Sequence, residues 1–125
     1  MDRVREGRLS ECSTANFGKI RGGTATNVVC DQVEITGEAR SRNQEELDQY
    51  LAYLSELVST IAGQYQTRID LEIERHYDAF CVEETEPVSV LLKKAFQALG
   101  TACYFSQGGG GMDANRFSSA GIRSL

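Results

Sequence analysis

The sequence predicts an α+β fold in which an antiparallel sheet and its helices form two layers. Two segments, Val33 to Arg40 and Arg68 to Tyr77, alternate apolar and polar residues, which is the pattern of a strand with one buried face. Between them, apolar residues at spacings of three and four from Leu47 to Tyr65 predict an amphipathic helix. The order strand, helix, strand therefore indicates an antiparallel sheet covered by a helix.

The residues before this helix contain a further strand candidate and the signals of a helix start. A short apolar run from Ala15 to Ile20 leads into a glycine-containing turn. Ser41 or Asn43 can supply the N-cap of the helix. Glu45 and Glu46 follow in the first turn, where the helix dipole favours negative charge.

The last forty or so residues are typical of one helix–strand unit in a separate layer. The single proline, Pro87, can begin a helix, and the apolar stripe that follows it stops at Gly100. Residues 101–105 form a short strand candidate, and four glycines follow at 108–111. Residues 117–125 are expected to form a helical turn and the start of another strand.

Composition excludes several classes of protein. The 125 residues carry a formal net charge of -5, which argues against nucleic acid or an anionic membrane as the main partner. Apolar stretches are far shorter than the roughly 20 residues of a membrane span, and no apolar leader is visible, so we expect a soluble, cytoplasmic protein. The four cysteines form no Cys-x-x-Cys pair and there is one histidine, which favours reduced thiols over a structural zinc site.

The most informative segment is the glycine run that leads into Met112, Asp113, Ala114 and Asn115. Glycine lets a ligand approach main-chain N–H groups closely, so this loop is a candidate binding site. Two plainer interpretations stay open. The run can be a flexible linker, and Asp113 can orient the loop through hydrogen bonds to its backbone.

Three separate motifs, in order along the chain, resemble those of one enzyme family. It is the peptidase T-like branch of the dinuclear zinc aminopeptidase and carboxypeptidase superfamily. The motifs are Ser-Thr-Ala-Asn-Phe-Gly-Lys-Ile-Arg-Gly-Gly-Thr-Ala-Thr-Asn-Val-Val-Cys-Asp at 13–31, Gly-Glu-Ala-Arg-Ser at 37–41 and Gly-Gly-Gly-Met-Asp-Ala-Asn at 109–115.

The resemblance implies roles for particular residues. Asn27, in the Gly-Gly-Thr-x-Thr-Asn turn, is expected to reach the active site of a neighbouring subunit. Arg40 is the expected anchor for a substrate carboxylate, a task that suits the planar guanidinium fork. The loop residues are expected to line the substrate cleft, and the expected contacts there are Gly110, Gly111, Asp113 and Asn115.

The same resemblance implies the domain organisation. Residues 1–82 are expected to form a partial ferredoxin-like lid, or dimerisation domain, that begins after the first strand and most of the first helix of such a lid. Residues 83–125 are expected to form a helix–strand–loop part of the α/β catalytic domain. The motifs that hold two zinc ions in such enzymes do not occur in the chain. We therefore expect a fragment that binds no metal and is inactive by itself.

The function this predicts is part of a zinc-dependent exopeptidase that hydrolyses short peptides, contributing substrate-binding and homodimer-forming elements. Met112 is a departure from the family, since relatives usually carry Ser or Thr directly before the aspartate and a thioether cannot donate a hydrogen bond. The alternative is a stand-alone, non-catalytic dimerisation or interaction module. Its contacts would be the helix at 47–65 and the strand at 33–40.

Overall fold

The computed structural model describes residues 4–125. The chain forms two compact units, and the boundary between them in the sequence lies between Glu72 and Ile73. The first unit holds a three-stranded antiparallel sheet and one long helix, and the second holds two shorter helices. This is the α+β class expected from the sequence. The predicted domains, 1–82 and 83–125, stay a prediction.

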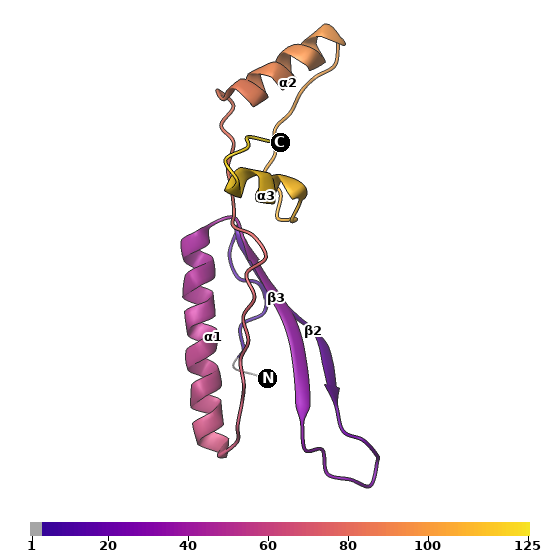
Figure 1. Cartoon of the computed structure of the whole chain (residues 1–125), viewed down its shortest axis with the longest axis vertical. Coiled ribbons are helices and arrows are strands. Elements are labelled where there is room, and N and C mark those ends of the chain that lie inside the picture. Colours follow the sequence, from indigo (N-terminus) through magenta and orange to yellow (C-terminus); the bar gives the residue numbers. More distant parts are fainter. Residues whose placement is uncertain (1–3) are drawn as a thin grey trace. The chain divides into compact units, whose positions relative to one another are not determined.

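The sheet of the first unit is built around one long hairpin (Figure 1). β1 (Gly7–Arg8), β2 (Ser13–Gly22) and β3 (Val33–Ser41) pair in that order. In β2 and β3 the register places Ser13 opposite Ser41 at one end and Gly22 opposite Val33 at the other. A bulge between Phe17 and Lys19 interrupts this register. The apolar run predicted from 15 to 20 is therefore part of a longer strand.

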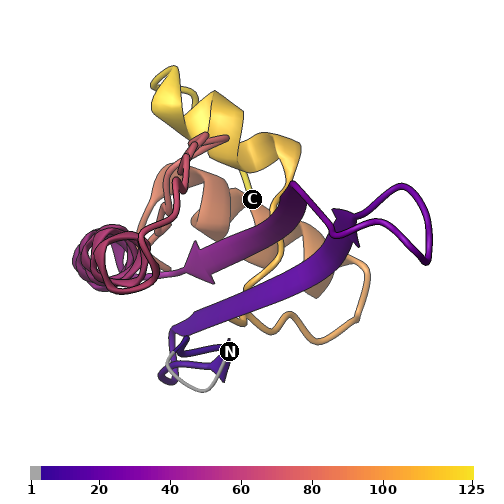
Figure 2. The same cartoon turned by 90° about the horizontal axis from the view of Figure 1, so that it is seen from below.

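The helix α1 (Gln44–Tyr65) packs beside β3, as the end-on view in Figure 2 shows. Asn43 is its N-cap, because the Asn43 side chain accepts hydrogen bonds from the N–H groups of Glu45 and Glu46 at 2.9 and 3.3 Å. Both glutamates lie in the first turn, as predicted. Of the two predicted N-cap candidates the structure selects the asparagine, since the Ser41 hydroxyl accepts from Asn43 N instead.

A polar network closes the end of the sheet against this first helical turn. The Glu46 carboxylate accepts hydrogen bonds from Ser10 at 2.6 Å and from Ser13 at 2.5 Å. The Ser13 and Ser41 hydroxyls are 2.7 Å apart, and Ser13 is only 4% exposed. These hydrogen bonds, from Ser10 first and Ser13 second, lower the pKa of Glu46 from its ordinary value of 4.5.

The core of the first unit lies at this same end. Ala15 and Tyr50 are buried, with 3% and 7% of their surface exposed. The Tyr50 hydroxyl donates to the Arg5 carbonyl at 2.7 Å, and burial raises the pKa of this tyrosine. Toward the hairpin loop the predicted burial of one face of β3 is wrong. Val33 and Ile35 are 55% and 51% exposed, because none of the described elements covers that half of the hairpin.

Three other predicted strands are absent from the described residues. Residues 68–77, 101–105 and 122–125 have no strand ladder. The alternation at 68–77 reflects an extended backbone, visible after α1 in Figure 1, that forms no strand ladder with the described segments. A period of two reports which way side chains point, whereas a strand also needs a partner edge.

The second unit contains α2 (Pro87–Ala98) and α3 (Asp113–Ser119). Pro87 is the first residue of α2 and Gly100 follows the helix with φ of 65°, as the sequence predicted. Lys93 on α2 pairs with Glu84 at 2.6 Å and lies over the Phe105 ring at 5.2 Å. These contacts fasten the segments before and after α2 to the helix.

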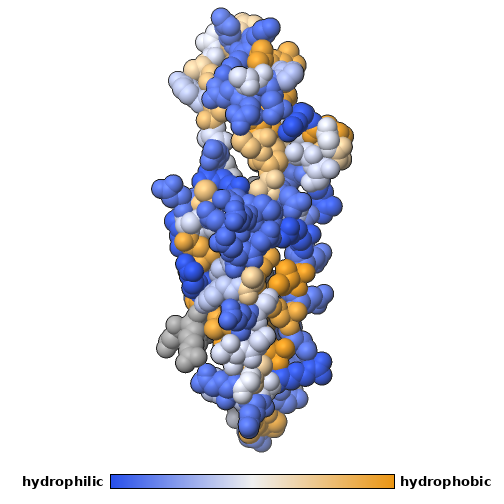
Figure 3. Space-filling view, turned by 90° about the vertical axis from the view of Figure 1, so that its left-hand side faces the viewer, coloured by the Kyte–Doolittle hydropathy of each residue, from blue (hydrophilic) through white to orange (hydrophobic). Residues whose placement is uncertain are grey.

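Apolar side chains reach the surface of both units. Figure 3 shows one face, on which apolar residues lie in separate patches among hydrophilic ones. None of the helices in residues 4–125 is both long and apolar enough to cross a membrane. The more exposed apolar side chains include Val29, Tyr104 and Leu99, at 92%, 89% and 78%.

The Glu46 network predicts a specific dependence of stability on pH. Because folding lowers the pKa of Glu46, its contribution is present above the ordinary value of 4.5 and is lost as the pH falls through the lower folded value. Glu46→Gln should therefore flatten the loss of unfolding free energy below about pH 4.5 in urea titrations. Glu56→Gln, at an exposed position of the same helix, is the control. Equal acid sensitivity of Glu46→Gln and the wild type would contradict this.

Two glycine substitutions should change stability in opposite directions. A Cβ at Gly63, inside α1, would meet nothing within 4 Å, so Gly63→Ala should stabilise the chain by about 0.5–1 kcal/mol. A Cβ at Gly37 would lie 2.7 Å from the Asn16 carbonyl oxygen and from Phe17, so Gly37→Ala should destabilise it. Urea unfolding of both variants tests the pair, and a shift of the same sign in both would refute the hairpin packing.

Candidate functional site

The glycine loop ends in a helix start that is fastened by one side chain. Met112 is the N-cap of α3, and its N–H donates to the Asn115 Oδ1 atom at 3.0 Å. The Asn115 Nδ2 atom donates to the Asp78 carbonyl at 2.9 Å. Asn115 is 7% exposed, so both ends of its amide are used inside the unit. The loop is thereby tied to the extended segment at 76–78.

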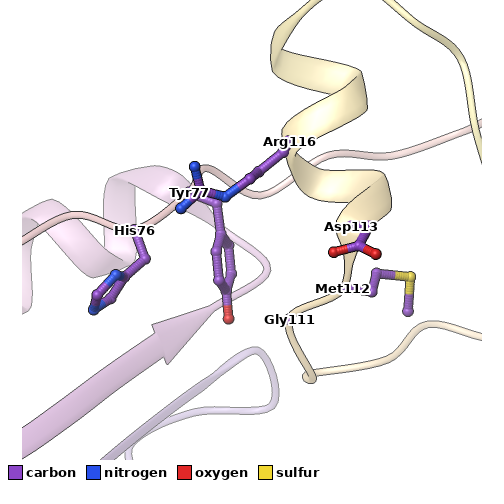
Figure 4. A pocket seen from close by; sticks show the side chains of 6 residues that line it. All are labelled: His76, Tyr77, Gly111, Met112, Asp113 and Arg116. Atoms are coloured by element: carbon purple, nitrogen blue, oxygen red, sulfur yellow. The ribbon is translucent and has the colours of Figure 1, made fainter.

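A pocket of about 270 Å³ lies where these two segments meet (Figure 4). The residues that line it are His76, Tyr77, Gly111, Met112, Asp113 and Arg116. Tyr77 contacts the loop so closely that a Cβ at Gly111 would overlap its phenol oxygen. Gly111 does not have a positive φ, so the close contact, and not the backbone conformation, is what favours glycine there.

The pocket carries charges of both signs. Within residues 4–125, neither the Asp113 carboxylate nor the Arg116 guanidinium has a hydrogen-bond or ion-pair partner for its side chain. His76 lies 3.8 Å from the Glu74 carboxylate, measured from its Nδ1 atom. The pocket can therefore offer hydrogen-bond donors, one acceptor and a nearly balanced charge to a small polar ligand.

The two other predicted site residues lie in the first unit. Asn27 is exposed in the loop between β2 and β3, whereas Arg40 is near the opposite end of β3, where it pairs with Thr14 in the register. Arg40 lies seven positions after Val33 on the strand, which corresponds to about 23 Å. Asn27 and Arg40 therefore lie at opposite ends of the hairpin that β2 and β3 form. The Arg40 guanidinium is 2.9 Å from the Glu38 carboxylate, with 44% of the side chain exposed.

Among the predicted residues, the structure thus brings Gly111 and Asp113 together in one pocket. Gly110 and Asn115 do not line the pocket. Gly110 directly precedes the lining residue Gly111, and the buried Asn115 side chain links the two segments that form the pocket. Sequence reasoning missed His76 and Tyr77, because the alternation at 68–77 predicts a strand. It also missed Arg116, which lies in α3 one turn after Met112. The glycine at 111 was a signal of a close approach, but it could not indicate which side chain approaches.

The described residues do not fit a metal centre. None of their His, Cys, Asp and Glu side chains form a group of three or more that could hold a metal ion. The four cysteines are free thiols. The residues around the pocket can bind a ligand through hydrogen bonds and charge.

Comparison with known proteins identifies the first unit. Residues 5–66 match the peptidase dimerisation domain family, M20_dimer. A Bacillus subtilis protein, YqjE, is 36% identical over 116 residues, which cover 93% of this chain and 31% of that protein.

Two crystal structures resemble the chain over nearly its whole length. The aminopeptidase PepT from Bacillus cereus is 34% identical with a TM-score of 0.86, over 98% of this chain and 33% of that one. A tripeptidase from Staphylococcus aureus is 30% identical with a TM-score of 0.89, over 97% of this chain and 32% of that one.

The chain thus spans about one third of the length of these relatives. The likeness covers both units, because nearly all of the chain aligns with each crystal structure. Residues 5–66 belong to the peptidase dimerisation domain family, and the chain that contains them is of the peptidase T-like kind.

Proposed function

We propose that this chain is part of a zinc-dependent exopeptidase of the peptidase T type, which hydrolyses short peptides. The observation that carries the proposal is the likeness of 98% of the chain to an aminopeptidase at a TM-score of 0.86. In this proposal the two zinc ions are held by other parts of the enzyme. The chain by itself is inactive, and its residues bind the peptide and form the dimer.

Arg40 is the proposed anchor for a free carboxylate of the peptide. Its guanidinium is partly exposed and lies on a strand, which is a rigid support for a binding group. The pairing with Glu38 at 2.9 Å holds the side chain to one face of β3, and the planar guanidinium fork is suited to bind a carboxylate in two places.

Asn27 is the proposed contact with the active site of the neighbouring subunit. The length of the hairpin supports this, because about 23 Å of strand keeps Asn27 away from Arg40 of its own chain. The two residues would then serve different active sites of one homodimer. The loop residues Gly110, Gly111 and Asp113 are the proposed peptide contacts of the second unit.

A cytoplasmic location is part of the same proposal. All four cysteines are free thiols, as is typical of proteins in a reducing compartment. The net charge of -5 makes nucleic acid an unfavourable partner.

One observation favours the second function, a stand-alone dimerisation module. Ile20 and Ile35 lie opposite each other in the register and, with Val33, form an apolar patch that is more than half exposed on the hairpin. β3 is also an edge strand of the described sheet. An apolar patch beside an open edge is a surface that can pair with a second copy.

Substituting Arg40 tests the peptidase proposal. In the complete enzyme, Arg40→Ala should raise KM by about 10- to 100-fold for a tripeptide with a free carboxylate, as expected from the loss of a charge-assisted hydrogen bond. The KM for the corresponding peptide amide should not change. Arg21→Ala, an exposed arginine on the same hairpin, is the matched control. A wild-type KM for Arg40→Ala would remove this residue from the site, and activity that survives chelation of metals would contradict zinc dependence.

Sedimentation of the 125-residue chain tests the homodimer. The wild-type chain should sediment as a dimer, and Ile35→Lys should shift it to a monomer because a charge in the apolar patch opposes its burial. Thr36→Lys is the control, since neighbouring residues of a strand point to opposite faces. A wild-type monomer at high concentration would count against both the module and dimerisation through this patch.

A further inference from the structure

Tyr77 holds a defined position beside the glycine loop. Of the four glycines at 108–111, three have nothing within 4 Å of the place where a Cβ would be. The fourth, Gly111, has the Tyr77 phenol there. Since no positive φ requires glycine at 111, the sequence has a glycine where the tyrosine ring needs the space.

Asn115 fixes the backbone next to this tyrosine. Its Nδ2 atom donates to the carbonyl of Asp78, the residue that follows Tyr77, at 2.9 Å. Its Oδ1 atom accepts from Met112 N, the residue that follows Gly111, at 3.0 Å. One buried amide therefore connects the two segments that form the walls of the pocket, and a buried side chain whose polar atoms are all bonded is rigid.

The Tyr77 hydroxyl is available to form a hydrogen bond with a ligand. It has no hydrogen-bond partner within the part of the chain that the structure describes, and Tyr77 is 38% exposed. Figure 4 shows its ring directed toward Gly111, with the hydroxyl at the end that faces the loop. A hydroxyl in this place can donate one hydrogen bond to a ligand in the pocket.

We propose that Tyr77 is a substrate-binding residue whose hydroxyl donates a hydrogen bond to a carbonyl oxygen of the bound peptide, and that Asn115 is the positioning residue that holds it there. A neutral acceptor suits the pocket better than a second carboxylate, because the Asp113 and Arg116 charges offset each other. This rests on the proposed function for the nature of the ligand. It also changes the role expected for Asn115 from a peptide contact to a support.

Binding of a tripeptide to the 125-residue chain tests the proposal directly. With ¹³C-labelled tyrosine rings, addition of Ala-Ala-Ala should shift the NMR signal of Tyr77. The signal of Tyr104, which is 89% exposed on the same unit, should stay unchanged. Tyr77→Phe should weaken binding by about 2- to 10-fold, the usual effect of one neutral hydrogen bond. Tyr104→Phe is the matched control. A Tyr77 signal that stays in place, unchanged affinity of Tyr77→Phe, or no binding at about 10 mM peptide would overturn the proposal.

Substitutions at the loop test the positioning. Gly111→Ala should move the Tyr77 signal without peptide and weaken binding, whereas Gly109→Ala should do neither, because a Cβ at 109 meets nothing within 4 Å. Asn115→Asp keeps the acceptor for Met112 N and loses the donor to the Asp78 carbonyl. It should shift the Tyr77 signal while the helical circular dichroism is retained. An unshifted signal in both Gly111→Ala and Asn115→Asp would refute the arrangement.

The outcomes separate this proposal from the proposed function. Peptide hydrolysis by the complete enzyme together with peptide binding that does not involve Tyr77 would refute only the role of Tyr77. Peptide bound at Tyr77, with no hydrolysis of any short peptide by the complete enzyme, would refute only the exopeptidase.

Discussion

The first unit depends on the carboxylate of Glu46, which joins three elements at one point. It accepts hydrogen bonds from the hydroxyls of Ser10 and Ser13, and the Ser13 hydroxyl in turn contacts that of Ser41 at the end of β3. The start of β2, the end of β3 and the first turn of α1 are thereby fixed to one another. Few apolar residues are buried in this unit. These hydrogen bonds, and not a large core, therefore fix the positions of the strands and the helix.

This placement of the rigid end has a consequence for function. Arg40 precedes Ser41 and therefore lies at the fastened end of the hairpin, whereas Asn27 lies at the far end, in a loop that the described core does not cover. A carboxylate anchor benefits from a rigid support, because a preorganised group loses little entropy when it binds. A residue that reaches into a neighbouring subunit benefits from a long arm. In the proposed function, the single hairpin supplies both, with Arg40 as the anchor and Asn27 as the residue that reaches the neighbouring subunit.

The sequence predicted the elements that are encoded locally. The N-cap of α1, its acidic first turn, the start of α2 at Pro87 and its end before Gly100 all follow from short-range hydrogen bonding and backbone geometry. The strand at 33–41 was also found. The strand predicted at 68–77 is absent from the described residues, because strand pairing depends on a neighbour that periodicity does not reveal.

The same distinction explains which parts of the candidate site were found. Gly111 and Asp113 could be recognised from the sequence, because a glycine run followed by an acidic residue is a local pattern. Tyr77 was not, because its partner lies 34 positions away in the sequence and the contact depends on Asn115 linking the two segments. A local pattern could show that a glycine is needed but not what occupies the space beside it.

In the proposed function the residues of this chain bind the peptide, and this sets which kinetic constants they can change. The described side chains include no group that could hold a metal. Hydrogen bonds from Tyr77 or Arg40 that are equally strong in the ground state and the transition state act on KM, and only those that strengthen in the transition state act on kcat. A donor fixed by a buried amide cannot follow a substrate that is loosely placed, so the Asn115 link favours peptides whose carbonyl lies at one defined position. Selectivity for short peptides would then arise from the fixed positions of the donors and not from the size of the pocket.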